Sequence, residues 1–291
     1  MPAQIRKTAL HVEQTLIEGG KAAMTPTTLP LSDGHVSYVA RGSGTPVLLI
    51  HGVGMDARAW TPQIAALHTD HRVIAIDMPG HGGSSPLPRG SALPAFVAWL
   101  GEVCDALALG PCNIAGHSMG ALIAGGFACS FPEQVARVAL LNPVYRRSAA
   151  ARAAVNARAG EIAKGVFDLE TPLARWFGDS AAEAEAKALT GQLLSEVSIE
   201  GYAKAYAAFA GGDATCADQI AHIRCPLLAL TADGDQNSTP DMSHAIAAAA
   251  PLGRAQVIPG HRHMVNLTAP DAVNAALKTW LQTPIAQEVL P

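Results

Sequence analysis

A serine set between glycines is the first group in the chain that could do chemistry. Residues 116–120 read Gly-His-Ser-Met-Gly, with Ser118 at the centre, after an apolar run over residues 113–115 and before a helical pattern that starts near Ala121. A tight turn from a strand into a helix leaves little room for side chains, which glycine tolerates because it has no Cβ. The pattern predicts that Ser118 is a nucleophile at the carboxyl end of a strand, where the start of the helix favours developing negative charge.

A serine hydroxyl needs a base within hydrogen-bonding distance, and the base needs a group that orients it. Two later loops offer such groups in the order serine, acid, histidine. The first loop contains Asp233 and Asp235, and the second contains His261 and His263. Each loop follows an apolar run, so both should lie at the carboxyl edge of a sheet. The residues alone leave the choice within each pair open.

The elements that must hold these loops alternate along the chain. Continuous apolar runs rich in β-branched residues, separated by helical stretches, indicate a parallel sheet covered on both faces. The expected fold class is therefore α/β, with a mostly parallel, doubly wound sheet. Strands are predicted at residues 36–40, 47–50, 73–76, 113–115, 135–141, 227–231 and 255–258, and helices at 92–108 and 121–130, among others.

One interval breaks the alternation. Residues 145–221 contain no convincing strand, are rich in alanine, and carry charges and aromatics at helical spacing. Such an insertion predicts a helical cap over the carboxyl edge of the sheet; a separate helical domain fits less well because no Gly/Pro/Ser linker sets the interval apart. The predicted organisation is an N-terminal extension (1–28), a core (29–144 and 222–291) and the cap. Within the extension, residues 5–17 fit a short amphipathic helix.

From about residue 31 to residue 281 the chain resembles the α/β-hydrolase superfamily, and in particular its capped bacterial serine hydrolases of small molecules. That family often places its acid in a G-x-x-D pattern, and Asp235 matches the acid although Ala232 stands where the glycine is usual. The family's G-x-x-H pattern matches Gly260 to His263. The resemblance therefore implies Asp235 as the acid and His263 as the base.

An oxyanion hole completes such a site. One donor should be the backbone N–H of Met119, which follows the nucleophile, and the family pattern implies the N–H of Val53 as the other. Three nearby histidines are expected to be structural. His51 would orient its loop, His81 lies in a loop common in the superfamily, and His117 would pack beside the serine turn.

The expected reaction is acyl transfer to water through an acyl-enzyme. An ester or lactone is the first choice of substrate, a C–C bond of a ring-cleavage product the second and an amide the third; a ligand receptor with little turnover is the alternative from another class. A serine at the nucleophile position argues against dehalogenases and epoxide hydrolases. The residues expected to line the pocket are Trp60, Tyr145, Arg146, Trp176 and Tyr206, within a longer set that adds Met55, Met119, Phe177, Tyr202 and Phe209.

Two arginines at the start of the predicted cap suggest a contact with the substrate. Arg146 and Arg147 could pair with a substrate carboxylate, although a solvated hinge is the simpler interpretation.

Composition narrows the partners. The net charge is −4 with no run of like charges, so nucleic acid is not expected. No stretch approaches the length of a membrane span. The five cysteines form no C-x-x-C pair, which favours free thiols in the cytoplasm. Because zinc-binding, phosphate-binding and dinucleotide-binding motifs are missing, neither a metal nor another cofactor is expected. The predicted partner is a small-molecule substrate, and homodimerisation is left open.

Overall fold

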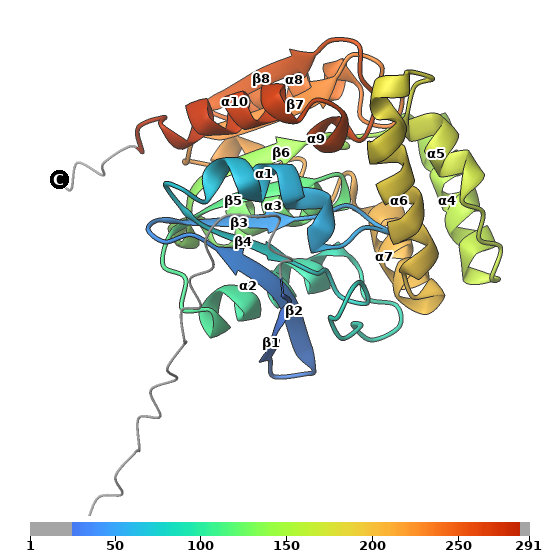
Figure 1. Cartoon of the computed structure of the whole chain (residues 1–291), viewed down its shortest axis with the longest axis horizontal. Helices are drawn as coiled ribbons and strands as arrows, with labels where there is room; N and C mark the ends of the chain where they lie inside the picture. The colour runs from blue at the N-terminus through green and yellow to red at the C-terminus, as the bar shows by residue number, and fades with distance from the viewer. Residues whose placement is uncertain (1–24, 286–291) are drawn as a thin grey trace, which may run out of the picture.

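A computed structural model describes residues 25–285, and eight strands form one sheet in it (Figure 1). They are β1 (Thr27–Pro30), β2 (His35–Arg41), β3 (Pro46–Ile50), β4 (Arg72–Ile76), β5 (Cys112–His117), β6 (Val135–Leu141), β7 (Leu227–Ala232) and β8 (Gly253–Ile258). Their spatial order is β1-β2-β4-β3-β5-β6-β7-β8. β2 pairs antiparallel with β1 and with β4, and every other neighbouring pair is parallel. The predicted α/β fold class is confirmed.

Alternate side chains of the central strands enter two apolar layers. Leu48 and Ile50 of β3 pack into the layer that contains Phe96, whereas Val47 and Leu49 pack into the layer that contains Leu277. The first layer lies under α2 (Leu93–Ala106), α3 (Met119–Ser130) and α8 (Pro240–Ala249), and the second under α1 (Thr61–Leu67) and α10 (Pro270–Leu281). Burial on both faces explains why these strands read as continuous apolar runs.

All seven predicted strands are present, each with ends within two residues of the prediction, and α2 and α3 occupy the two predicted helices. β1 was not predicted; it is a four-residue strand at the edge of the sheet that pairs with β2. It begins at Thr27, inside the segment predicted as an N-terminal extension. The helix predicted at residues 5–17 lies outside the described residues.

The interval between β6 and β7 is helical. It contains α4 (Ala149–Ala163), α5 (Glu170–Trp176), α6 (Ala184–Glu196) and α7 (Ile199–Gly212). Figure 1 shows these helices grouped at one end of the sheet. The remaining short elements are α9 (Val265–Thr268) and the 3₁₀ turns Ala57–Trp60, Pro132–Gln134, Ala181–Glu183 and Ile220–His222.

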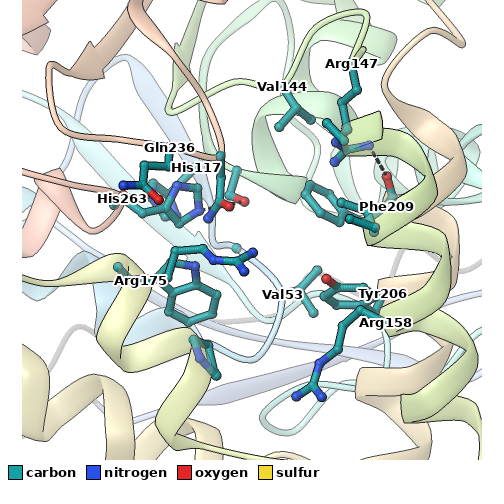
Figure 2. A pocket seen from close by; sticks show the side chains of 18 of the residues that line it. Val53, His117, Val144, Arg147, Arg158, Arg175, Tyr206, Phe209, Gln236 and His263 are labelled. Carbon is teal, nitrogen blue, oxygen red and sulfur yellow. Dashed lines mark hydrogen bonds between the residues drawn. The ribbon is translucent and has the colours of Figure 1, made fainter. Parts of the chain in front are cut away.

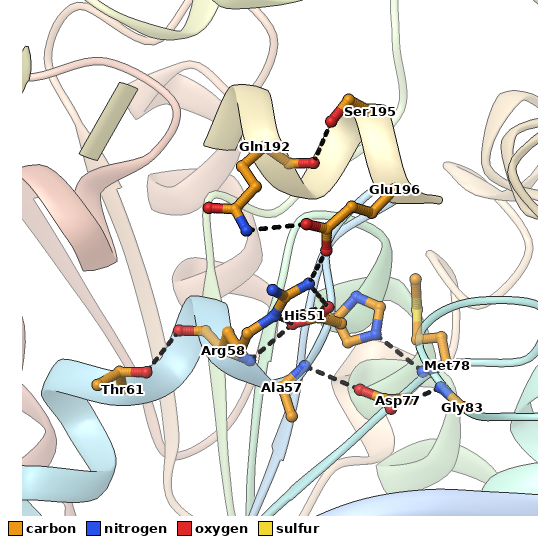
Figure 3. Close-up of polar contacts among 11 residues, drawn as sticks. His51, Ala57, Arg58, Thr61, Asp77, Met78, Gly83, Gln192, Ser195 and Glu196 are labelled. Atoms are coloured by element: carbon orange, nitrogen blue, oxygen red, sulfur yellow. Dashed lines mark hydrogen bonds and ion pairs between the residues drawn. The ribbon is translucent and has the colours of Figure 1, made fainter. Parts of the chain in front are cut away.

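Contacts that join this helical segment to the rest of the chain include an ion pair and a close approach of two backbones. Arg58 pairs with Asp56 beside it and with Glu196 at the end of α6 (Figure 3). The backbone of Gly201 in α7 lies against Gly80, so that a Cβ added at Gly201 would fall 1.9 Å from the Gly80 carbonyl oxygen. Only glycine permits so close an approach.

All five cysteines are free thiols. Over residues 25–285, no helix combines the length and the apolar character that crossing a bilayer requires.

Candidate active site

The turn between β5 and α3 holds Ser118 in a strained backbone conformation. Its φ is 55° and its ψ is −111°, and its N–H donates to the Leu141 carbonyl at 2.9 Å. A Cβ at Gly116 would lie 2.0 Å from the Gly120 carbonyl oxygen, and one at Gly120 would lie 2.1 Å from the Ile50 carbonyl oxygen. Both glycines are therefore required by space, because a turn this tight packs backbone against backbone.

Ser118, His263 and Asp235 form a continuous hydrogen-bonded chain. The Ser118 Oγ lies 3.1 Å from the Nε2 of His263, and the Nδ1 of His263 lies 2.8 Å from an Oδ2 of Asp235. All three side chains are buried. This is the geometry that lets an imidazole remove the serine proton while a carboxylate fixes the tautomer of the imidazole.

Asp235 is held by four donors. Asn142 Nδ2 donates to Oδ2 at 2.8 Å, beside His263, and the N–H groups of Asn237 and Ser238 donate to Oδ1 at 2.8 and 3.1 Å. Burial raises the pKa of Asp235, but the positive charge available on His263 and the hydrogen bonds from His263 and Asn142 outweigh it and hold the pKa below its usual value. The carboxyl group is therefore ionised at neutral pH.

The alternatives that the sequence left open occupy other positions. Asp233 accepts a hydrogen bond from the Gly260 N–H at 2.8 Å and lies in an exposed turn. The Nδ1 of His261 lies 3.0 Å from the Thr268 hydroxyl and 3.6 Å from a carboxylate oxygen of Glu183. Neither residue contacts Ser118 in the structure.

His117 supports the loop that carries His263. Its Nε2–H donates to the His263 carbonyl oxygen at 2.9 Å, and the two rings lie 5.1 Å apart. Burial, followed by repulsion from His263, lowers the pKa of His117 to about 3, so the ring is neutral.

The two predicted backbone donors belong to different segments: Val53 lies in the loop after β3, and Met119 lies in the serine turn. Among residues 25–285, the N–H groups of Val53 and Met119 make no hydrogen bond to another group. Gly52, beside Val53, lies so close to the turn that an added Cβ would be 3.2 Å from the Ser118 Cβ.

Two buried histidines brace the loop that contains Val53. The His51 Nε2 accepts from the Met78 N–H at 2.8 Å (Figure 3), and the His81 Nε2 accepts from the Gly54 N–H at 3.0 Å. Burial lowers the pKa of His51 to about 4 and of His81 to about 3, so both can act as neutral acceptors.

A cavity of about 440 Å³ lies above the serine, between the sheet edge and the helices α4, α5 and α7. Ser118, His263 and His117 form part of its wall. Trp176 also lines it, with its ring 5.6 Å from the His263 ring, and so does Tyr206. From the longer predicted set, the wall includes Met55, Tyr202 and Phe209.

Three predicted pocket residues lie elsewhere, and that part of the prediction is corrected. Trp60 is fully buried in the apolar layer under α1 and α10, on the other side of β3. Tyr145 borders a smaller recess beside α3. Arg146 is exposed and pairs with Asp218, away from the cavity. Met119 and Phe177 of the longer set are buried and do not line the cavity either.

Arg262 connects the loop after β8, which carries His263 and is called the base loop below, to the helical segment. It is adjacent to His263, and its Nη1 donates to the carbonyl oxygens of Ala174 at 3.0 Å and Phe177 at 2.6 Å, at the end of α5.

Some residues of the candidate site were not predicted from the sequence: Asn142, which donates to Asp235, and the cavity residues Arg158 and Arg175. Asn142 had a usable signal, because it is a polar residue directly after an apolar strand. Arg158 also had one, since it follows Ala151 and Val155 at helical spacing and all three line the cavity. Arg175 had no comparable signal.

Comparisons with known proteins show which family the chain resembles. The model of the Alpha/beta hydrolase family matches residues 47–276. The chain is 48% identical over 261 residues to the (E)-2-((N-methylformamido)methylene)succinate hydrolase of Acinetobacter baylyi, covering 89% of this chain and 99% of the relative. A putative carbamate hydrolase RutD of Azorhizobium caulinodans is 26% identical, with 84% of this chain and 94% of the relative covered. A thermophilic esterase from Thermogutta terrifontis, with malate bound, matches with a TM-score of 0.81 and 26% identity over 90% of this chain and 100% of the other.

Proposed function

The chain belongs to the alpha/beta hydrolase family, and on that premise we propose that it hydrolyses a small molecule through an acyl-enzyme on Ser118. The observation that carries the proposal is the chain of hydrogen bonds from Ser118 through His263 to Asp235 at the wall of a cavity. A serine that only shaped a turn would not need a buried imidazole and an ionised carboxylate in line with its hydroxyl.

In the proposed mechanism, the Ser118 Oγ attacks a carbonyl carbon of the substrate while the His263 Nε2 takes the serine proton. Asp235 stabilises the imidazolium that forms. The negative oxygen of the tetrahedral intermediate accepts hydrogen bonds from the N–H groups of Val53 and Met119, each worth about 3–4 kcal/mol to the transition state. The unpaired state of these two donors supports this role.

His263 then returns the proton to the leaving group, and the bond between that group and the acyl carbon breaks. A water molecule, deprotonated by the same imidazole, attacks the acyl-enzyme and releases the acid together with free Ser118. We assign residues 145–221 as the cap that keeps bulk water away from these steps. This assignment is supported by the cavity residues that α4, α5 and α7 contribute.

The bond type proposed here differs from the order expected from sequence. The substrate for which the 48% identical relative is named contains neither an ester nor a lactone. It contains an N-methylformamide nitrogen on a carbon–carbon double bond, and the two carboxylates of a succinate. The formyl carbon of that substrate, unlike its carboxylate carbons, does not belong to a negatively charged group. It is therefore a better electrophile than the carboxylate carbons. We therefore place amide hydrolysis of an N-acyl enamine first, with cleavage of a C–C bond as the alternative.

Labelling with a fluorophosphonate tests the nucleophile. Mass mapping should find the label on Ser118, and Ser118→Ala should abolish both labelling and turnover. Retained turnover in Ser118→Ala would refute the mechanism. A receptor would instead bind its ligand tightly while the native chain turned it over no faster than the alanine variant.

A substrate panel tests the bond. It should contain an N-formyl enamine of methylenesuccinate, short-chain esters, a lactone and a vinylogous diketone. Release of formate together with the enamine, or with the amine and aldehyde that water forms from that enamine, supports amide hydrolysis. A product that keeps the N-formyl group on a shortened carbon skeleton supports C–C cleavage. Preference for the esters or the lactone would reverse the order proposed here.

A further inference from the structure

The cavity wall is positively charged although the whole chain is negative. Its lining includes Arg147, Arg158 and Arg175, and among the described residues no aspartate or glutamate lines it. The chain as a whole carries a net charge of −4. An apolar cavity with arginines and no carboxylate in its wall favours a ligand that brings its own negative charge.

Arg147 is already committed to the protein. Its guanidinium lies 3.3 Å from a carboxylate oxygen of Asp213, donates to the carbonyl oxygens of Phe209 and Ala210, and stacks over the Phe209 ring at 4.3 Å. Its side chain is only 3% exposed. These contacts fix the end of α7, and they leave the other two arginines as the candidates for a ligand.

Arg158 is partly neutralised. It lies 3.3 Å from a carboxylate oxygen of Glu161 and 3.8 Å from one of Asp168. Both acids are more exposed than the arginine. They therefore offset part of the attraction between Arg158 and an anionic ligand without covering the guanidinium.

Arg175 has no such partner. Within residues 25–285, its guanidinium makes no ion pair or hydrogen bond, and Figure 2 shows the side chain extending into the cavity. It precedes Trp176, whose ring lies beside His263, so α5 brings a positive charge close to the base.

The hydroxyl of Tyr206 lies in the same part of the cavity. Figure 2 shows it turned toward Val53, and among the described residues it has no hydrogen-bond partner. Burial raises the pKa of Tyr206, and the positive charges of Arg158, Arg147 and Arg175 oppose that rise, so the phenol keeps its proton at neutral pH and can donate a hydrogen bond.

We propose that Arg175 and the Tyr206 hydroxyl together bind a carboxylate of the substrate, with Arg158 adding a weaker attraction for a second carboxylate. The inference rests on the proposed function for its orientation, since it places the carboxylate beside the acyl group that Ser118 attacks. The substrate class is then a small dicarboxylate, the class to which the substrate named for the 48% identical relative also belongs. Specificity for the anion comes from the helical segment, whereas the reaction comes from the sheet.

Binding measurements test this without assuming which bond is cleaved. Titration calorimetry compares succinate with succinamide, its neutral analogue, on the native chain and on variants. Succinate should bind at least about tenfold more tightly than succinamide, and its Kd should rise with salt concentration. Arg175→Gln should raise the Kd for succinate roughly 10- to 100-fold, Arg175→Lys should recover part of it, and Tyr206→Phe and Arg158→Gln should each have a smaller effect.

Lys164→Gln is the matched control, because it removes one positive charge from the end of α4 outside the cavity wall. Its Kd for succinate should stay within about twofold of the native value. Equal binding of succinate and succinamide, no detectable binding of succinate, or equal effects of Arg175→Gln and Lys164→Gln would overturn the proposal. Failure of Ser118 labelling would refute the proposed function while leaving these binding results interpretable.

Discussion

His117 Nε2 donates to the backbone carbonyl oxygen of His263 across 2.9 Å, so the residue before Ser118 helps to fix the position of His263. The two residues are 146 positions apart in the chain. The contact means that the serine turn and the base loop are aligned directly by each other, and not only through the sheet that carries both.

Replacing His117 by alanine should lower kcat roughly 10- to 100-fold with little change in KM, since a base displaced by a fraction of an ångström accepts the serine proton less well. His117→Gln, which keeps a donor, should recover part of the loss. Steady-state kinetics over a range of pH measure kcat and KM for both variants. The acid limb of the kcat/KM profile, which reports the base, should stay in place. An unchanged kcat in His117→Ala would show that the contact does not position His263.

Asp235→Asn should lower kcat by about 10⁴-fold while leaving the fold intact, because the amide favours the wrong tautomer of His263. Asp233→Asn is the control, since Asp233 contacts the Gly260 N–H and not the imidazole. It should lose less than about threefold in kcat. Equal losses in the two variants would contradict the assignment of the acid.

Asn142 allows a test that separates activity from stability. Its side chain donates to Asp235, and its backbone has a φ of 47°. Asn142→Ala and Asn142→Gly both remove the donor and should lower kcat to the same extent, roughly tenfold. Only alanine is strained at this φ, so the alanine variant should be less stable than the glycine variant by about 1 kcal/mol. Urea unfolding measures the difference; equal stabilities would show that the conformation is not retained.

Stability should fall in acid because of three buried histidines. Burial lowers the folded-state pKa of His51 to about 4 and of His81 and His117 to about 3, from an ordinary value of 6.5. The unfolded chain therefore binds more protons below pH 6.5. The stabilisation is fully present above that pH and is lost as the pH falls to about 4 for His51 and to about 3 for His81 and His117, by up to about 1.4 kcal/mol per histidine per pH unit.

Urea unfolding from about pH 7.5 to about pH 5 measures this slope. His81→Asn should reduce the slope by about a third, since it removes one of the three groups. A free energy of unfolding that does not change over this range would mean that the three rings are not buried in the neutral form.

The sheet was predictable because its signal is local. A strand buried on both faces, such as residues 47–50, must be apolar at every position, and the next residues must turn. β1 gives no such signal, since Thr27 to Pro30 is short, exposed and paired only at the edge. Its formation depends on β2, a partner that the sequence of β1 does not encode.

The candidate catalytic residues were predictable for a related reason. Each lies in the turn or loop that follows a strand, and parallel strands bring their carboxyl ends to one edge. The cavity wall was not predictable to the same extent. Trp60 and Trp176 are both aromatic residues in helical surroundings, yet one fills the core and the other lines the cavity, because the face of a helix that meets a cavity depends on how the helix docks. Arg175 is likewise indistinguishable in sequence from an arginine that faces water.

The hydrogen bonds from Arg262 to the carbonyl oxygens of Ala174 and Phe177 limit how this protein could be redesigned. A chimera that exchanged residues 145–221 for the corresponding segment of a relative would alter the specificity of the cavity, but it would also replace the acceptors that hold the neighbour of His263. Grafts that carry over their own version of residues 260–264 should therefore retain more activity than grafts of the helices alone. New substrate preferences would have to be selected on both segments together.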